Sequence, residues 1–388
     1  MHPSPVHATE DLLFSILTQL IVMIGAARIM NTLFRRIGQP GVIGEILAGL
    51  MLGPSLFGHF FPGASLAVFG AKASPPITVL SQVGLILLMF QIGMDFEFGH
   101  LTSACGRKGV GLIAVAPIGV PFILGLLIGQ ISAPILAPTI DPTVYSLFIG
   151  VGLAITAVPI LGRILRQFDL NRTELGTVAI SAAALNDVVG WVMLAGISAL
   201  ATAKFSGAHT AVQVAEIVGF GAALWFVARP LTAIFGGFAA GLLFHRHIAF
   251  VDAWRRQVGA FVLVFFLPVF FCFTGLRTNI LGLSTGTDAY WLAIILTAAI
   301  LGKIIPVYIA ARASGFDHPQ SSILGTLMNT RALMELIVLN IGLDLGFLPQ
   351  NVFTMMVIMA VVTTIMTGPL LKVLLPRTGH IIPVGVEA

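Results

Sequence analysis

Long apolar segments separated by short polar connections run along most of the chain. Segments of membrane-spanning length lie at about 11–34, 77–94, 109–131, 143–166, 174–203, 257–276, 290–311, 321–348 and 351–375, and a shorter one covers about 41–53. A helix needs roughly 20 apolar residues to cross the hydrocarbon core of a bilayer. The pattern therefore predicts an all-α polytopic membrane protein with about 11–12 spans.

Two stretches do not fit simple spans. Closely spaced glycine and proline residues between 54 and 76 predict an irregular connection with room for a short interfacial helix. At 211–245 the apolar pieces on either side of Arg229-Pro230 are each only about 15 residues long, which is short for a full span. One long helix broken at Pro230 is compatible with a cytoplasmic position for the arginines near this stretch, whereas two separate short spans are not.

The composition agrees with a membrane protein and excludes a soluble domain. Hydrophobic residues make up 57% of the chain and charged residues 9%, against roughly 25% charged residues in soluble domains. The formal net charge of +4 does not indicate a nucleic-acid partner, because the basic residues fall mostly in short connections, as the positive-inside rule expects.

These basic residues predict an orientation in the membrane. If the N-terminus lies outside, the cytoplasmic connections carry Arg35, Arg36, Arg107, Lys108, Arg163, Arg166, Arg172 and Arg229, against Lys72 and Lys204 on the outer side. The excess predicts a multi-pass protein of the cell membrane, here a bacterial inner membrane, with its N-terminus outside and its C-terminus in the cytoplasm.

The order of the segments indicates an inverted repeat. The segments 109–131, 143–166 and 174–203 are followed by 290–311, 321–348 and 351–375, and the two sets run oppositely under the orientation above. The middle helix of each set is interrupted, first at Thr156-Ala157-Val158-Pro159 and then at Asn329-Thr330-Arg331-Ala332. Inverted repeats whose broken helices cross near the midplane are typical of secondary transporters.

Asp187 is the only charged residue between Leu175 and Ala203. An unpaired charge in the middle of a bilayer costs roughly 2.5 kcal/mol or more, so this carboxylate is a candidate ion or proton site. Lys303 lies in a second apolar run, from Tyr290 to Ala311, and has no nearby partner in the sequence. A carboxylate and an ammonium that face one cavity can satisfy each other until a cation or proton intervenes.

Several separated motifs resemble the monovalent cation:proton antiporters, the family that includes bacterial sodium/proton and potassium/proton exchangers and plant cation/proton exchangers. The two longest are Ala154-Ile155-Thr156-Ala157-Val158-Pro159-Ile160-Leu161-Gly162-Arg163-Ile164-Leu165 and Ser181-Ala182-Ala183-Ala184-Leu185-Asn186-Asp187-Val188-Val189-Gly190-Trp191. Three others are Gly44-Glu45-Ile46-Leu47-Ala48-Gly49 leading to Gly53-Pro54-Ser55, Gly275-Leu276-Arg277-Thr278, and Asn329-Thr330-Arg331-Ala332-Leu333-Met334-Glu335-Leu336. The resemblance covers nearly the whole chain.

The resemblance implies an architecture and a mechanism. It implies a core domain of crossed broken helices, made of repeats 109–203 and 290–375, with 11–108 and 211–280 mainly forming the linker and the interface of a homodimer. Alternating access then exchanges Na⁺ or K⁺ for H⁺ at Asp187, with Lys303 close by on the second repeat. Asn186 stands where electrogenic relatives have a second aspartate, so one carboxylate predicts one-for-one, electroneutral exchange.

The roles of individual residues stay open at this point. Thr156 either bonds a helix carbonyl or joins Asp187 as a ligand of the monovalent cation, and Asn186 either orients a side chain or donates to a broken helix. Lys303 is either a structural partner of Asp187 or a proton carrier. Arg331 and Glu335, four residues apart, either form a local pair on one helix face or compensate broken-helix ends.

Two alternatives compete with exchange. Related folds host sodium-coupled symport of other solutes, and fold alone does not decide function. Family members also usually have a further helix and part of another between the positions of Leu231 and Thr232, so a shortened, transport-inactive membrane protein is the second alternative. Enzymatic chemistry is not indicated, because no metal-ligand cluster, nucleophile elbow or phosphate loop is found in the sequence, and no cofactor is expected.

Overall fold

Helices make up the secondary structure of the computed structural model. The structure describes residues 5–39, 41–70, 75–94, 110–170, 173–202, 240–241, 243–244, 247–283, 285–331 and 333–380. Within these residues no strand is present, and six helices are long and apolar enough to cross a membrane, or seven with the bent pair Ala249–Gly259 and Val262–Leu276. The predicted all-α membrane class is confirmed.

The described residues contain fewer long spans than the sequence predicts. Two predicted spans, 143–166 and 321–348, are each interrupted and form two shorter helices. Most of the predicted broken helix at 211–245, including Pro230 and the junction of Leu231 and Thr232, lies outside the described residues, and only 240–241 and 243–244, which are helical, are described.

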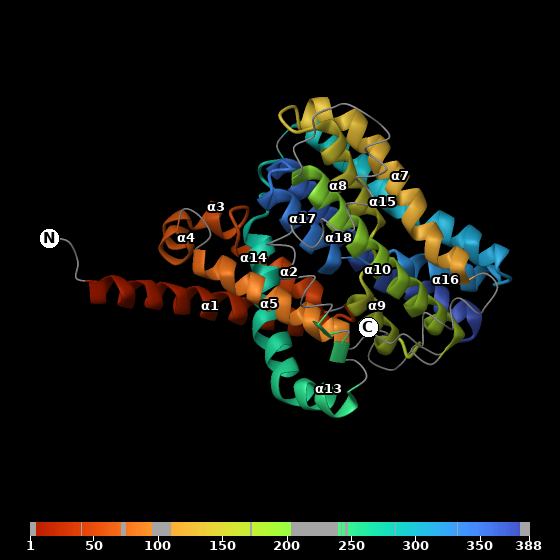
Figure 1. The fold of residues 1–388 in the computed structure, drawn as a ribbon, viewed down its shortest axis with the longest axis horizontal. Helices are drawn as coiled ribbons and strands as arrows, with labels where there is room; N and C mark the ends of the chain where they lie inside the picture. Colours follow the sequence, from red (N-terminus) through yellow and green to blue (C-terminus); the bar gives the residue numbers. More distant parts are fainter. Residues whose placement is uncertain are drawn as a thin grey trace. The chain divides into compact units, whose positions relative to one another are not determined.

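The chain divides into two compact units. Figure 1 shows the chain with colours that follow the residue number. The first contains Met1–Asp95 and Gly237–Leu283, and the second contains Phe96–Gly236 and Ser284–Ala388. Both predicted repeats, 109–203 and 290–375, fall in the second unit, and most of 11–108 and 211–280 falls in the first. The role of the first unit as a dimer interface stays a prediction.

The first unit is built around helices that approach closely through glycine. Its elements are α1 (Pro5–Arg36), α2 (Gly41–Leu52), α3 (Phe57–Phe60), α4 (Pro62–Phe69), α5 (Pro75–Met94), α13 (Ile248–Trp254), η1 (Arg255–Gly259), η2 (Val262–Phe266) and α14 (Leu267–Leu276). A Cβ atom on Gly275 would lie 2.4 Å from the carbonyl carbon of Gly49, so the backbones of α2 and α14 touch there. The glycines of two predicted family motifs therefore serve packing, which is the usual role of small residues between membrane helices.

Two parts of the first unit differ from the sequence prediction. The irregular connection at 54–76 contains two short helices, α3 and α4, instead of one. The helical segment that ends at Leu276 begins at Ile248, before the predicted start at about 257. It contains the π-helical turns η1 and η2 and a bend of 42°, and π-turns of this kind interrupt the regular helical pattern on which the prediction rests.

The second unit contains the two repeats. Its elements are α7 (Val110–Leu136), α8 (Pro142–Ala154), α9 (Val158–Gln167), α10 (Glu174–Thr202), α15 (Gly286–Ala313), α16 (His318–Met328), α17 (Leu333–Asp344), α18 (Gln350–Leu374) and η3 (Leu375–Thr378). Figure 1 shows α7 beside α15, the first helices of the two repeats. In each repeat the first helix packs along the first half of the broken helix, α7 along α8 and α15 along α16.

The two broken helices begin in the same way. Asp141 caps α8, with its carboxylate accepting from the backbone N–H groups of Thr143 and Val144 at 2.9 and 3.0 Å. Asp317 caps α16 in a capping box with Gln320. A proline lies in the first turn of each helix, where its missing N–H has no helical partner to lose. This shared start supports the repeat relation that the order of segments predicts.

Both predicted breaks are present. α16 ends at Met328 and α17 begins at Leu333, as predicted. The first break covers only residues 155–157, so Val158 and Pro159 open α9 instead of interrupting the chain. The reason is that proline is tolerated in the first turn of a helix, where it can start the helix as well as end one.

Candidate functional site

The two breaks contact each other directly. The backbone N–H of Ala157 donates to the carbonyl oxygen of Thr330 at 3.2 Å. The hydroxyl of Thr156 donates to the carbonyl oxygen of Met328 at the same distance. Backbone groups freed by a break in a membrane helix need partners inside the protein. Each break therefore supplies partners to the other, and segments far apart in the sequence cross at one point.

Asn186 closes the first break from α10. Its side-chain oxygen accepts from the backbone N–H of Thr156 at 3.2 Å, and its side-chain nitrogen donates to the carbonyl oxygen of Ala154 at 3.3 Å. An amide can do both because it carries a donor and an acceptor, whereas a carboxylate only accepts. The chemistry of the break therefore favours asparagine at position 186.

Asp187 faces the start of the second half-helix. Its carboxylate accepts a hydrogen bond from the backbone N–H of Val158, the first residue of α9. The N-terminus of a helix carries a partial positive charge that favours an anion. Asp187 is only 5% exposed, and within the described chain its Oδ1 atom has no hydrogen-bond partner. One carboxylate oxygen is thus fixed and the other has unused capacity to accept.

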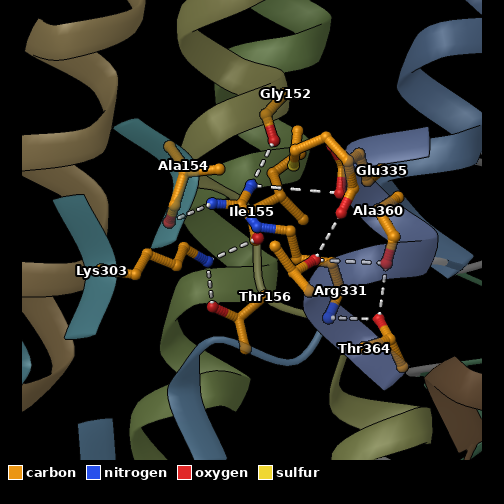
Figure 2. Close-up of polar contacts among 12 residues, drawn as sticks. Gly152, Ala154, Ile155, Thr156, Lys303, Arg331, Glu335, Ala360 and Thr364 are labelled. Carbon is orange, nitrogen blue, oxygen red and sulfur yellow. Dashed lines mark hydrogen bonds and ion pairs between the residues drawn. The ribbon is translucent and has the colours of Figure 1, made fainter. Parts of the chain in front are cut away.

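Lys303 reaches the first break from α15, as Figure 2 shows. Its fully buried ammonium group donates to the carbonyl oxygen of Ile155 at 2.6 Å and to the hydroxyl of Thr156. It also interacts electrostatically with Asp187. The oxygen atoms of the first break therefore already have a donor, the side chain of Lys303, supplied by the protein itself.

Arg331 and Glu335 lie next to the crossing. The guanidinium of Arg331 lies 3.9 Å from a carboxylate oxygen of Glu335, one turn further along. The same guanidinium donates to the carbonyl oxygens of Gly152 and Ala299 at 2.9 and 3.2 Å. Arg331 thus takes both of the roles left open above, because it pairs locally and also satisfies a carbonyl near the end of α8 (Figure 2).

The structure brings together all six residues that the sequence singles out, Thr156, Asn186, Asp187, Lys303, Arg331 and Glu335, within the second unit. It also shows contributors that sequence reasoning missed. The backbone carbonyls of Gly152, Ile155 and Ala299 leave no mark in the sequence. The side-chain hydroxyl of Thr364 on α18 accepts from the backbone N–H of Arg331 at 3.2 Å. The only sequence signal for Thr364 was that it is a polar residue in an apolar span.

A solved structure shares this fold. The sodium proton antiporter MjNhaP1 from Methanocaldococcus jannaschii superposes with a TM-score of 0.55, covering 93% of this chain and 96% of that chain at 17% identity. Identity at that level supports the fold alone. The predicted antiporter fold is thereby confirmed.

Curated proteins resemble the chain in sequence. The Na⁺/H⁺ antiporter NhaS4 of Synechocystis sp. is 35% identical over 411 aligned positions, which take in 95% of this chain and 99% of that protein. Cation/H⁺ antiporter 17 of Arabidopsis thaliana is 32% identical over 95% of this chain, which spans 50% of that protein. The NhaS4 alignment is longer than the 388 residues of the chain, so that relative has residues with no counterpart here.

A family model gives the same result. The model described as sodium/hydrogen exchanger, transmembrane, matches residues 20–264 and 220–377. The two matches overlap in the region where the sequence indicates a missing segment, and together they take in most of the chain. The chain therefore belongs to the transmembrane sodium/hydrogen exchanger family.

Proposed function

We propose that the protein exchanges Na⁺ or K⁺ for H⁺ across a membrane by alternating access, with cation and proton competing for Asp187. The observation that carries this proposal is the position of Asp187. It is a buried carboxylate in a membrane-length helix, at the crossing of two broken helices, with one oxygen that makes no hydrogen bond to the described protein. The names of the relatives support the same exchange reaction.

The oxygen atoms around Asp187 suit a hard monovalent cation, since carboxylate, hydroxyl and carbonyl oxygens are its preferred ligands. The hydroxyl of Thr156 and the carbonyl of Ile155, which bond Lys303, are of this kind. A cation that bound both Asp187 and Thr156 would meet the charge of Lys303 close by. Cation entry is then coupled to a displacement of Lys303, and protonation of Asp187 removes the charge that attracts the cation.

Reconstitution tests the proposal. Purified protein in vesicles that contain a pH-sensitive dye should move protons when Na⁺ or K⁺ is added outside. Flux that requires a further solute would indicate sodium-coupled symport, and no flux with either cation would indicate a transport-inactive protein. The relatives give neither of these two alternatives any support.

Lys303→Gln should affect stability more than transport. The melting temperature should fall clearly, and the exchange rate should fall little. Glutamine keeps a donor for the carbonyl of Ile155 but removes the charge, and a hydrogen bond to a charged group is worth about 1.5–3 kcal/mol. Thermal melting and cation-dependent proton flux on the same preparation measure both effects, and Lys303→Arg, which keeps the charge, is the control. If neither quantity changes in the glutamine variant, Lys303 has no role in the site.

Exchange should be electroneutral. Of the neighbouring positions 186 and 187, only Asp187 carries a carboxylate. The side-chain amide of Asn186 is hydrogen-bonded to the backbone of Ala154 and Thr156. Competition of one cation and one proton for one charge moves no net charge. The exchange rate should therefore be independent of an imposed membrane potential. A sustained current on a solid-supported membrane, driven by the cation gradient, would contradict one-for-one exchange and make Lys303 the candidate carrier of a second proton.

The placement of the protein in the cell is part of the same proposal. We place the protein in a bacterial inner membrane, and the charge bias of the connections supports an external N-terminus and a cytoplasmic C-terminus. The first unit, with its exposed apolar residues on α1 such as Phe14, Ile21 and Ile29, is the part proposed to form a homodimer.

A further inference from the structure

Two buried side chains in the second break have unexplained oxygen atoms. Asn329, the residue directly after α16, and its neighbour Thr330 are 1% and 0% exposed. Within the residues that the structure describes, neither Asn329 Oδ1 nor Thr330 Oγ1 has a hydrogen-bond partner. The amide nitrogen of Asn329 donates to the sulfur of Met366, at 3.6 Å, and a thioether is a weak acceptor. Buried polar atoms without partners call for an explanation, and a bound ion is one.

The backbone of the second break lies near Asp187. The backbone N–H of Ala157 donates to the carbonyl of Thr330, and the next N–H along the chain, that of Val158, donates to the carboxylate of Asp187. Successive residues are about 3.8 Å apart and a hydrogen bond is about 3 Å long. The bonded oxygens of Thr330 and Asp187 are therefore within roughly 10 Å of each other.

The chemistry of the three free oxygens is that of a cation site. Asp187 Oδ1, Asn329 Oδ1 and Thr330 Oγ1 are a carboxylate, an amide and a hydroxyl oxygen, all buried and all without a donor in the described protein. Oxygens of these types bind hard cations. Thr156 and Asn186, by contrast, are engaged in hydrogen bonds that hold the breaks together. The carboxylate oxygens of Glu335 also make no hydrogen bond within the described residues, but one of them lies 3.9 Å from the guanidinium of Arg331 and is paired with that charge.

We propose that Asn329 Oδ1 and Thr330 Oγ1 are direct ligands of the transported cation, opposite Asp187. The inference rests on the proposed function and deepens it, because it assigns the second repeat a direct part in cation binding. Asp187 supplies the charge, which acts on Na⁺ and K⁺ alike. Asn329 and Thr330 are neutral ligands on the opposite break, so their number and spacing set the discrimination between the two ions.

Substitution of the two neutral ligands tests the assignment. Thr330→Val keeps the side-chain shape and removes the hydroxyl, Thr330→Ser keeps the hydroxyl, and Asn329→Ala removes the amide. Proton flux in vesicles is measured over a range of NaCl and KCl concentrations. The valine and alanine variants should each raise the apparent KM for the preferred cation on the order of tenfold and change the ratio of the Na⁺ and K⁺ values. The serine variant should stay near wild type.

A binding measurement and a matched control make the test independent of turnover. Because a bound ion stabilises the state that binds it, NaCl or KCl should raise the melting temperature of the wild type, and less so that of Thr330→Val. Thr326→Val is the control, since Thr326 is also buried in α16 but its hydroxyl donates to the carbonyl of Ser322 at 2.9 Å.

The outcomes separate this inference from the proposed function. Unchanged KM values and unchanged thermal shifts in folded Thr330→Val and Asn329→Ala, with an active wild type, would overturn the ligand assignment alone. A wild type without cation-dependent flux or thermal shift would overturn the proposed function and this assignment with it. If Asn329→Ala does not fold, the pair Thr330→Val and Thr330→Ser decides.

Discussion

Replacing Asp187 with asparagine is expected to reduce cation-dependent proton movement to the background of empty vesicles, with normal insertion into the membrane. Cation and proton must bind the same carboxylate in turn, and an amide can neither attract the cation with a charge nor take up the proton. Asparagine has nearly the same size, and its side-chain oxygen can still accept from the backbone N–H of Val158, so the local fold should persist. Proton flux in reconstituted vesicles, together with the elution profile in detergent, measures both.

The matched control is Asp141→Asn. Asp141 is an exposed carboxylate that caps α8, and asparagine caps helices about as well as aspartate. This variant should exchange ions at the wild-type rate. Asp187→Glu, which keeps a carboxylate but displaces it, should retain some exchange with weaker apparent affinity. Flux close to wild type in Asp187→Asn would contradict the assignment of Asp187 as the shared site.

Replacing Arg331 with methionine is expected to lower the free energy of unfolding by about 3–5 kcal/mol, as removal of one member of a buried charge pair does. The substitution leaves the carboxylate of Glu335 buried, 1% exposed, without its positive partner. It also removes the donors to the carbonyl oxygens of Gly152 and Ala299. Thermal melting of the purified protein in detergent measures the effect.

The double variant Arg331→Met with Glu335→Gln separates the two causes. Glutamine removes the uncompensated charge, so the double variant should be more stable than the single one and less stable than wild type, because the two carbonyls still lack donors. A single variant that melts like the wild type would show that Arg331 does not hold the crossing together. A double variant no better than the single one would assign the loss to the carbonyls alone.

The order of segments and the two breaks were predictable from the sequence because they have local causes. Apolar runs of bilayer length specify helices, since a backbone in lipid must satisfy its own polar groups. Interruptions by short polar stretches, such as Asn329 to Ala332, stand out against those runs. Asp187 and Lys303 were visible for the same reason, because a single charge in an apolar helix has few explanations other than function.

Other features did not follow from the pattern of apolar positions. The first break begins at Ile155, and Pro159 lies inside α9, because a proline can open a helix as well as break one. The π-turns that follow Trp254 interrupt the regular helical repeat, and that helical segment begins earlier than its apolar run. A pattern of apolar positions carries no information about such irregularities.

By itself, the sequence determined a helical membrane protein with two repeats, a buried carboxylate and a buried lysine, since transfer from water to lipid constrains each segment separately. The tertiary structure alone decided which groups meet. It placed Lys303 on the oxygens of Ile155 and Thr156, Arg331 on carbonyls from two other helices, and the two breaks against each other. Most of these contacts end on backbone carbonyls, and every residue has one, so only the path of the chain through space selects which carbonyl becomes a partner.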